Sequence, residues 1–164
     1  MELTEKTQQQ KAKAPVQRTM ELDECITILV EDIVKEKNLD VSGAKIACML
    51  VSPNISKTTV TKIIKSNKEL KHFSGYDFVL EISAEVWHNL DTRTQTILLE
   101  HQLRHLMVTT NEKTGAYDFK LRQHDIQDFS KVINDYGTDW SKTIKVTLSS
   151  IYDLTPAEED RIII

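Results

Sequence analysis

Two histidines one helical turn apart are the residues of this chain whose types and spacing could do chemistry. His101 and His105 lie at positions i and i+4 of the run HQLRH. On a helix these positions share a face, so both imidazoles can bind one metal ion, and HExxH on a helix is the signature of a zinc hydrolase. The second position of the motif is Gln102 here instead of glutamate. The motif therefore fits a working zinc hydrolase, a disabled one or a coincidental pair.

A helix over Asp91–Thr110 is predicted to carry this motif. Asp91 and Thr92 can each provide a side-chain oxygen that caps the free amides of the first turn. Spacings of three and four residues place one set of side chains on a common face of this helix. These side chains are Ile97, Leu98, His101, His105 and Val108.

Length and composition indicate a soluble globular protein. The 164 residues suffice for one domain with a core, and 40% of them are hydrophobic and 28% charged. A net charge of −4 argues against a general affinity for nucleic acid or anionic membranes. The N-terminus is too polar for a signal peptide and no apolar run is long enough to span a membrane, so a cytoplasmic location is expected. Cys25 and Cys48 lie in apolar runs and are predicted to be buried free thiols, with a single disulfide as the alternative.

Periodicity predicts one helix and three strands ahead of the HxxxH helix. Met1–Thr19 is polar and low in complexity, which predicts a flexible tail. Trp87 and Leu90 are expected to be buried in the connector that follows the last strand. The predicted helix covers Leu22–Lys37, and the predicted strands cover Ala44–Ser52, Ser56–Ser66 and Tyr76–Ser83.

The segment Ser56–Ser66 can be interpreted in two ways. As a helix, it has the serines, threonines and lysines of a helix-turn-helix recognition segment, and the chain would bind DNA. As a strand, it has six β-branched residues among the seven from Thr58 to Ile64, and such residues are poor helix formers. The strand is favoured, paired with Ala44–Ser52 as a hairpin through Pro53–Lys57.

Five sequence segments, taken in order, resemble a known family. They are YDFVLEI at Tyr76–Ile82, Trp87, LLEHQLRHL at Leu98–Leu106, HDIQDF at His124–Phe129, and YG followed by a tryptophan at Tyr136–Trp140. This arrangement is similar to that of the putative phage metallopeptidases, a zincin-like group related to the minimal gluzincins and SprT-like domains. The resemblance extends approximately from Ile46 to Trp140.

The resemblance implies a fold and a metal site. The fold is α+β, with a small sheet of about three to four strands packed against the HxxxH helix and further helices. The implied cofactor is zinc, with His124 as a third ligand beside His101 and His105 and a fourth position left for water. Asp125 and Asp128 follow closely enough to accept a hydrogen bond from a ligand imidazole.

Residues beyond the resemblance are expected to form a C-terminal extension. The zincin-like domain is predicted to cover residues 20–142, and the extension residues 143–164. A β-branched alternation in Lys142–Ser150 predicts a strand or an extended arm. Thr155 and Pro156 are typical of a helix start. Ile162–Ile164 are expected to pack against the domain, with an exposed patch that binds a partner as the alternative.

Gln102 is the departure from the family that bears most on function. The glutamate of HExxH takes a proton from the attacking water, whereas a glutamine can only hydrogen-bond to it. Glu100 lies on another side of the predicted helix and Arg104 is expected to face solvent, so neither replaces the base. The family usually has a glutamate at the position of Gln127 and a cysteine near the position of Arg104. These departures favour natural degeneration over a deliberate Glu→Gln change.

The favoured hypothesis is therefore a degenerate metallopeptidase-like protein, encoded by a phage or mobile element, that keeps a histidine metal site and acts by binding a protein or peptide. The first alternative is an active zinc peptidase, or one inactivated by an introduced change. The second is a helix-turn-helix DNA-binding protein. The expected location is the cytoplasm, which is that of the host cell for a phage-encoded protein.

Overall fold

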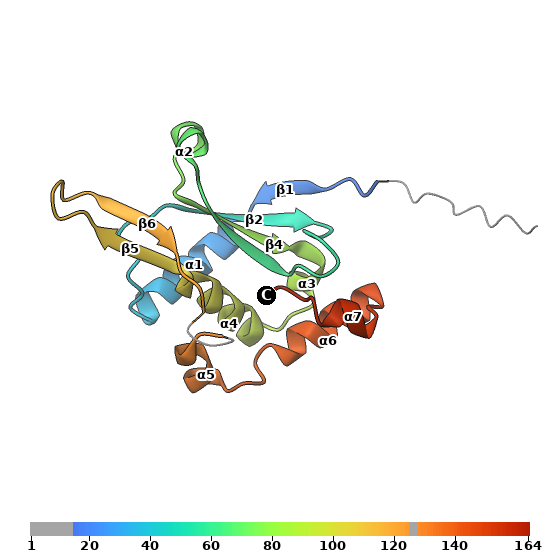
Figure 1. The fold of residues 1–164 in the computed structure, drawn as a ribbon. Coiled ribbons are helices and arrows are strands. Elements are labelled where there is room, and N and C mark those ends of the chain that lie inside the picture. The colour runs from blue at the N-terminus through green and yellow to red at the C-terminus, as the bar shows by residue number, and fades with distance from the viewer. Residues whose placement is uncertain (1–14, 125–127) are drawn as a thin grey trace, which may run out of the picture.

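The computed structural model describes residues 15–124 and 128–164 and has the predicted α+β architecture (Figure 1). A four-stranded mixed sheet has the strand order β1-β2-β4-β3, and a separate pair is formed by β5 and β6. The strands of the larger sheet are β1 (Thr19–Leu22), β2 (Ile46–Ser52), β3 (Thr61–Lys65) and β4 (Phe78–Ser83). The tail prediction for Met1–Thr19 falls largely outside the described residues, and Thr19 itself begins β1.

The structure corrects two predictions about the strands. A hairpin between Ala44–Ser52 and Ser56–Ser66 was expected. Instead, β4 lies between β2 and β3, parallel to β2 and antiparallel to β3. Cys48 and Ile63 both pair with Leu80 as a result. Residues Thr61–Lys65 are a strand, so the helix-turn-helix interpretation is wrong. The two central strands are the more apolar ones, whereas β3 carries exposed lysines that suit the edge of a sheet.

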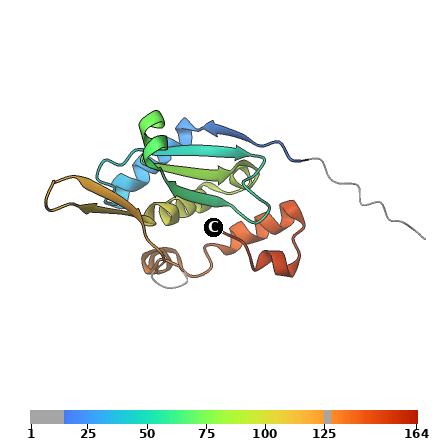
Figure 2. The same ribbon diagram turned by 45° about the horizontal axis from the view of Figure 1, so that its top comes forward.

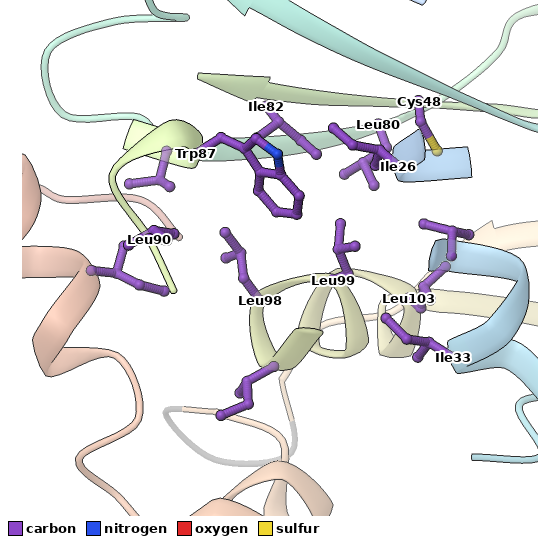
Figure 3. Packing of buried hydrophobic residues seen from close by; sticks show 14 of the residues in the cluster. Ile26, Ile33, Cys48, Leu80, Ile82, Trp87, Leu90, Leu98, Leu99 and Leu103 are labelled. Carbon is purple, nitrogen blue, oxygen red and sulfur yellow. The ribbon is translucent and has the colours of Figure 1, made fainter. Parts of the chain in front are cut away.

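Two helices cover one face of this sheet and enclose the core (Figures 1 and 3). They are α1 (Glu24–Glu36) and α4 (Thr92–Arg104), and each begins at an aspartate whose side chain accepts a hydrogen bond from a first-turn amide. Leu98, Leu99 and Leu103 of α4 point toward Leu80 and Ile82 of β4. These leucines pack α4 on the sheet, and only Leu98 among them belongs to the face that the periodicity predicts.

The helix that carries the histidines ends earlier than predicted. It stops at Arg104 with His105 as its C-cap, and the chain continues as β5 (Leu106–Thr110) instead of helix. The run from Val108 to Thr110 is β-branched, which favours a strand. β5 pairs with β6 (Tyr117–Leu121) in an antiparallel hairpin.

The C-terminal residues are helical where a strand was predicted. The described elements after β6 are α5 (Ser130–Tyr136), α6 (Lys142–Tyr152) and α7 (Pro156–Glu159). The strand prediction for Lys142–Ser150 is wrong because Ile144 and Leu148, four residues apart, are both fully buried in the main core. Thr155 forms the predicted helix start, with a capping box to Glu158.

The connector between β4 and α4 agrees with its prediction, whereas one cysteine does not. Trp87, on α3 (Ala84–His88), and Leu90 are both buried. Both cysteines are free, but only Cys48 is buried, because Cys25 lies on the solvent side of α1. The remaining helix, α2 (Lys68–Ser74), lies between β3 and β4 in the sequence. Among the described residues no helix is both long and apolar enough to cross a membrane.

Candidate metal centre

Three histidines converge at the C-terminal end of α4. The Nε2 atom of His124 lies 3.2 Å from Nε2 of His101 and 3.2 Å from Nε2 of His105. Among the described residues these three are the group of side chains placed to hold a metal ion, with ligand atoms all within 4.8 Å of one another. His72 and His88 are exposed and lie outside the group.

The β5–β6 hairpin brings His124 back to the end of α4. The pairing of Leu106 with Leu121 returns the chain to the helix end. The next residue, Arg122, fixes this return through its amide, which donates to the His105 carbonyl at 2.8 Å. Its guanidinium Nε also donates to the carbonyl of Arg104 at 2.5 Å. A hairpin therefore joins residues that lie 19 positions apart in the sequence.

Acceptor oxygens close to the Nδ1 atoms determine which imidazole nitrogens are free. Nδ1 of His101 lies 2.8 Å from Oδ1 of Asp128, and Nδ1 of His105 lies 2.9 Å from the carbonyl oxygen of Arg122. A carboxylate and a carbonyl are both acceptors, so each Nδ1 carries the proton and each Nε2 presents a lone pair. His124 Nε2 could donate to only one of these two lone pairs. A cation between the three nitrogens satisfies all of them.

The carboxylate beside His101 is itself held in place. Trp140 Nε1 donates to Oδ2 of Asp128 at 2.5 Å, and the amide of Phe129 donates to Oδ1 at 2.6 Å. Such an acceptor orients a ligand imidazole and makes it more basic. Asp128 thus has the contact predicted for it, while its role toward a metal stays a prediction. The other predicted acceptor, Asp125, lies outside the described residues.

Burial favours the neutral form of His101 and His105, which is the form that binds metals. Only 3% of His101 is exposed, and this burial is the main cause that lowers its pKa to about 4. The pKa of His105 is also lowered, again chiefly by burial. The Phe129 ring contacts all three imidazoles, with centroids 5.4, 4.8 and 5.0 Å from those of His101, His105 and His124. In this neutral form His101 and His105 can bind a metal without first losing a proton.

Comparison with known families shows which family the chain belongs to. The model of the family described as putative phage metallopeptidase matches residues 15–148. The chain belongs to this family. The match extends beyond the segments that carry the motifs, since it includes β1, α1 and the first part of α6. A search of the curated proteins found no match.

A metallopeptidase family implies a metal, usually zinc, and the three histidines fit one. Nitrogens bound to zinc at about 2.0–2.1 Å in a tetrahedron lie about 3.3 Å from one another. The two Nε2 separations of 3.2 Å agree with that spacing. Three protein ligands also leave one position of a tetrahedron open, as in catalytic zinc sites.

Gln102 stands next to this cluster on the helix. It is buried, with 3% exposed, and its side-chain amide makes no hydrogen bond to any residue that the structure describes. At about 100° per residue, Gln102 lies about 60° around the helix axis from His105. A glutamine without a partner in the described protein keeps its hydrogen-bonding capacity for a ligand.

Glu100, by contrast, is committed to a buried network on α4. Its carboxylate is fully buried and accepts from Arg104 Nε at 3.0 Å and from the Tyr136 hydroxyl at 2.6 Å, with Lys37 Nζ at 3.7 Å. Burial is the main cause that raises the pKa of Tyr136, so its phenol stays protonated as a donor. Arg104 was expected to face solvent, which is wrong, because only 11% of its side chain is exposed. The i,i+4 spacing of Glu100 and Arg104 was the sequence signal for this pair.

Proposed function

We propose that this chain binds zinc through His101, His105 and His124 and acts as a metallopeptidase-like protein that engages a protein or peptide without cleaving it. The observation that carries the metal site is the approach of His124 Nε2 to within 3.2 Å of both other Nε2 atoms. The observation that carries the loss of hydrolysis is Gln102 at the position that glutamate holds in HExxH.

The chemistry available at the site supports binding over turnover. Zinc, when bound by these histidines, supplies a Lewis acid. Gln102 can hydrogen-bond to a ligand but cannot accept a proton, and loss of a positioned general base slows a reaction by about 10²–10⁴-fold. Glu100 does not replace it, because its carboxylate is already bonded to Arg104 and Tyr136.

The proposed partner is a protein or peptide, in the cytoplasm of the cell that makes it, which is the host cell for a phage-encoded protein. A net charge of −4 disfavours nucleic acid. The strand at Thr61–Lys65 also removes the segment that could have been a DNA-recognition helix.

Zinc is expected to stabilise the protein through the three histidines. Free zinc at 100 times its Kd adds about 2.7 kcal/mol to the free energy of unfolding. For a chain of this size that raises Tm by roughly 5–10 °C. His124→Ala should abolish this rise, whereas His72→Ala should keep it, because His72 is exposed and outside the cluster. Thermal unfolding with and without zinc, beside elemental analysis of the purified protein, makes the measurement.

Two results would contradict the metal site. One is a purified protein that contains no zinc and whose Tm does not respond to added zinc. The other is a His124→Ala variant with the zinc response of the wild type, which would mean that the ion binds elsewhere.

Trp140 is expected to tune zinc affinity through Asp128. Trp140→Phe keeps an aromatic ring but removes the N–H that holds Oδ2 of Asp128. Loss of such an outer partner typically weakens metal binding by about 10–100-fold. Competition with a chromophoric chelator measures the affinity, and the absorption spectrum of the Co²⁺-loaded protein reports the ligand geometry. Trp87→Phe is the matched control, since Trp87 is also a buried tryptophan and lies beside Ile82 between the sheet and α4 (Figure 3). Equal affinity in Trp140→Phe and wild type would remove this role.

A further inference from the structure

The segment that carries His124 is fixed to the rest of the fold at Arg122. β6 ends at Leu121, and the chain then continues through His124 without regular structure. In both ribbon views it leaves β6 beside the end of α4 and runs on toward α5 (Figures 1 and 2). No main-chain group of Gln123 or His124 is hydrogen-bonded to a residue that the structure describes. On this side of His124, the main chain is therefore fixed only as far as Arg122.

Arg122 is bound in turn to the end of the helix that carries the other two histidines. Its amide donates to the His105 carbonyl at 2.8 Å, and its Nε donates to the Arg104 carbonyl at 2.5 Å. Carbonyls at the C-terminus of a helix have no partner within the helix, and the helix dipole favours a cation there. The Arg122 side chain thus caps α4 from 18 positions further along the sequence.

The same residue also contacts the histidine cluster. The carbonyl oxygen of Arg122 lies 2.9 Å from Nδ1 of His105. Its guanidinium carbon lies over the Phe129 ring, 4.8 Å from the ring centroid, in a cation–π contact. Phe129 is the ring that contacts all three imidazoles. Arg122 therefore touches one imidazole directly and the whole cluster through one ring.

The charge of Arg122 and its contacts would affect a bound metal in opposite directions. A guanidinium repels a nearby cation, so removal of the charge alone would strengthen zinc binding. The contacts hold the ligand side chains in place, so their removal would weaken zinc binding. Arg122 is exposed, and water screens the repulsion at such a position. The sign of the change in zinc affinity therefore distinguishes the two effects.

We propose that the Arg122 side chain is a positioning residue of the metal centre, which holds the segment of His124 against the end of α4 and supports Phe129 beneath the imidazoles. This inference deepens the proposed zinc site and rests on it. The planar guanidinium is essential to the role, because its N–H groups donate in the plane while its face lies on the ring. An ammonium group has no such face.

Arg122→Met in the full-length chain tests the proposal. It removes the guanidinium but keeps the main-chain amide and carbonyl, and it opens no cavity because Arg122 is exposed. We expect zinc affinity to fall about 10–100-fold, as on loss of other groups that orient metal ligands. Competition with a chromophoric chelator measures the affinity, at a temperature at which circular dichroism shows each variant to be folded.

Two further variants separate charge from geometry. Lys120→Met is the matched control, because it removes an exposed cation of β6 whose ion-pair partner in the described part of the chain is Asp118, at 3.3 Å. Its zinc affinity should stay within about twofold of the wild type. Arg122→Lys keeps the charge and loses the planar group, so it should also bind zinc more weakly than the wild type. Should Arg122→Met fail to fold, Arg122→Lys provides the same comparison.

The tautomer of His105 in the metal-free protein is a readout that a change in overall stability would not move. In the wild type the Arg122 carbonyl should keep the proton on Nδ1 of His105. Once the guanidinium no longer fixes this segment, Arg122→Met should show a mixture of the two tautomers, whereas Lys120→Met should resemble the wild type. NMR of the imidazole nitrogens makes the measurement.

The outcomes that would overturn the proposal differ from those that would remove the zinc site. Equal or tighter zinc binding by Arg122→Met would overturn the role of Arg122, as would a single His105 tautomer in that variant or full zinc affinity in Arg122→Lys. A wild type that binds no zinc, beside an Arg122→Met variant with mixed tautomers, would lose the metal site but keep the positioning of the histidines by Arg122.

Discussion

Glu100→Ala is expected to lower the free energy of unfolding by about 3–5 kcal/mol. The Glu100 carboxylate is fully buried, and three groups depend on it: the guanidinium of Arg104, the hydroxyl of Tyr136 and the ammonium of Lys37. Lys37 is 24% exposed and can turn toward water, whereas the Arg104 side chain is only 11% exposed. Removal of the carboxylate thus leaves a cation buried without its counterion, which is the main source of the loss. Chemical denaturation followed by circular dichroism measures it.

Two comparisons separate this effect from simple loss of an acidic side chain. Glu112→Ala removes an exposed acid and should change the free energy of unfolding by less than about 0.5 kcal/mol. The double variant Glu100→Met, Arg104→Met should be more stable than Glu100→Ala, because it removes the buried cation together with its partner. A double variant as unstable as Glu100→Ala would show that cavity formation, not the unpaired charge, dominates.

The network around Glu100 also connects stability to the candidate site. Glu100 precedes His101 on α4, and Tyr136 is the last residue of α5, so their hydrogen bond ties these two helices together. Phe129 and Asp128, which contact His101, lie immediately before α5. A variant that loosens this tie is therefore expected to weaken zinc binding as well, although Glu100 itself is not part of the histidine cluster.

The sequence was sufficient for elements whose burial follows their own periodicity. Ile97, Leu98 and His101 are buried on α4 as their spacing predicts, whereas Leu99 and Leu103 are buried although they lie outside the predicted face. The strand prediction for Lys142–Ser150 was wrong. The β-branched residues of this segment are typical of a strand, whereas Ile144 and Leu148 have the four-residue spacing of a buried helical face. Packing of those two side chains into the core decided the structure over intrinsic propensity.

Local sequence pattern could not predict which distant segments pack against one another. Neither strand alone encodes the parallel pairing of β2 with β4. Local pattern therefore predicts that β2 pairs with the strand nearest to it in the sequence, which is β3. His124 is similar: it lies 19 residues after His105 in a segment without helical or strand periodicity. Only the family resemblance pointed to it as a ligand. The β5–β6 hairpin then supplies the physical reason for its position.

Gln102→Glu is expected to produce zinc-dependent peptide hydrolysis at about 10²–10⁴ times the rate of the wild type. Glutamate has nearly the shape of glutamine, and the Gln102 side chain has no hydrogen bond to a described residue that the change would break. The new carboxylate would stand one residue after His101, where HExxH enzymes hold the group that accepts a proton from the attacking water. A fluorogenic peptide library or labelled casein, assayed with zinc and with EDTA, measures the rate.

Removal of a zinc ligand is the control for the gain in hydrolysis. Gln102→Glu combined with His124→Ala should be inactive, since it has the base but lacks the third nitrogen. A wild type that already hydrolyses peptides as fast as Gln102→Glu would contradict the proposed loss of turnover and identify an active peptidase with another base. A Gln102→Glu variant that binds zinc but hydrolyses nothing would instead mean that more than the base has been lost.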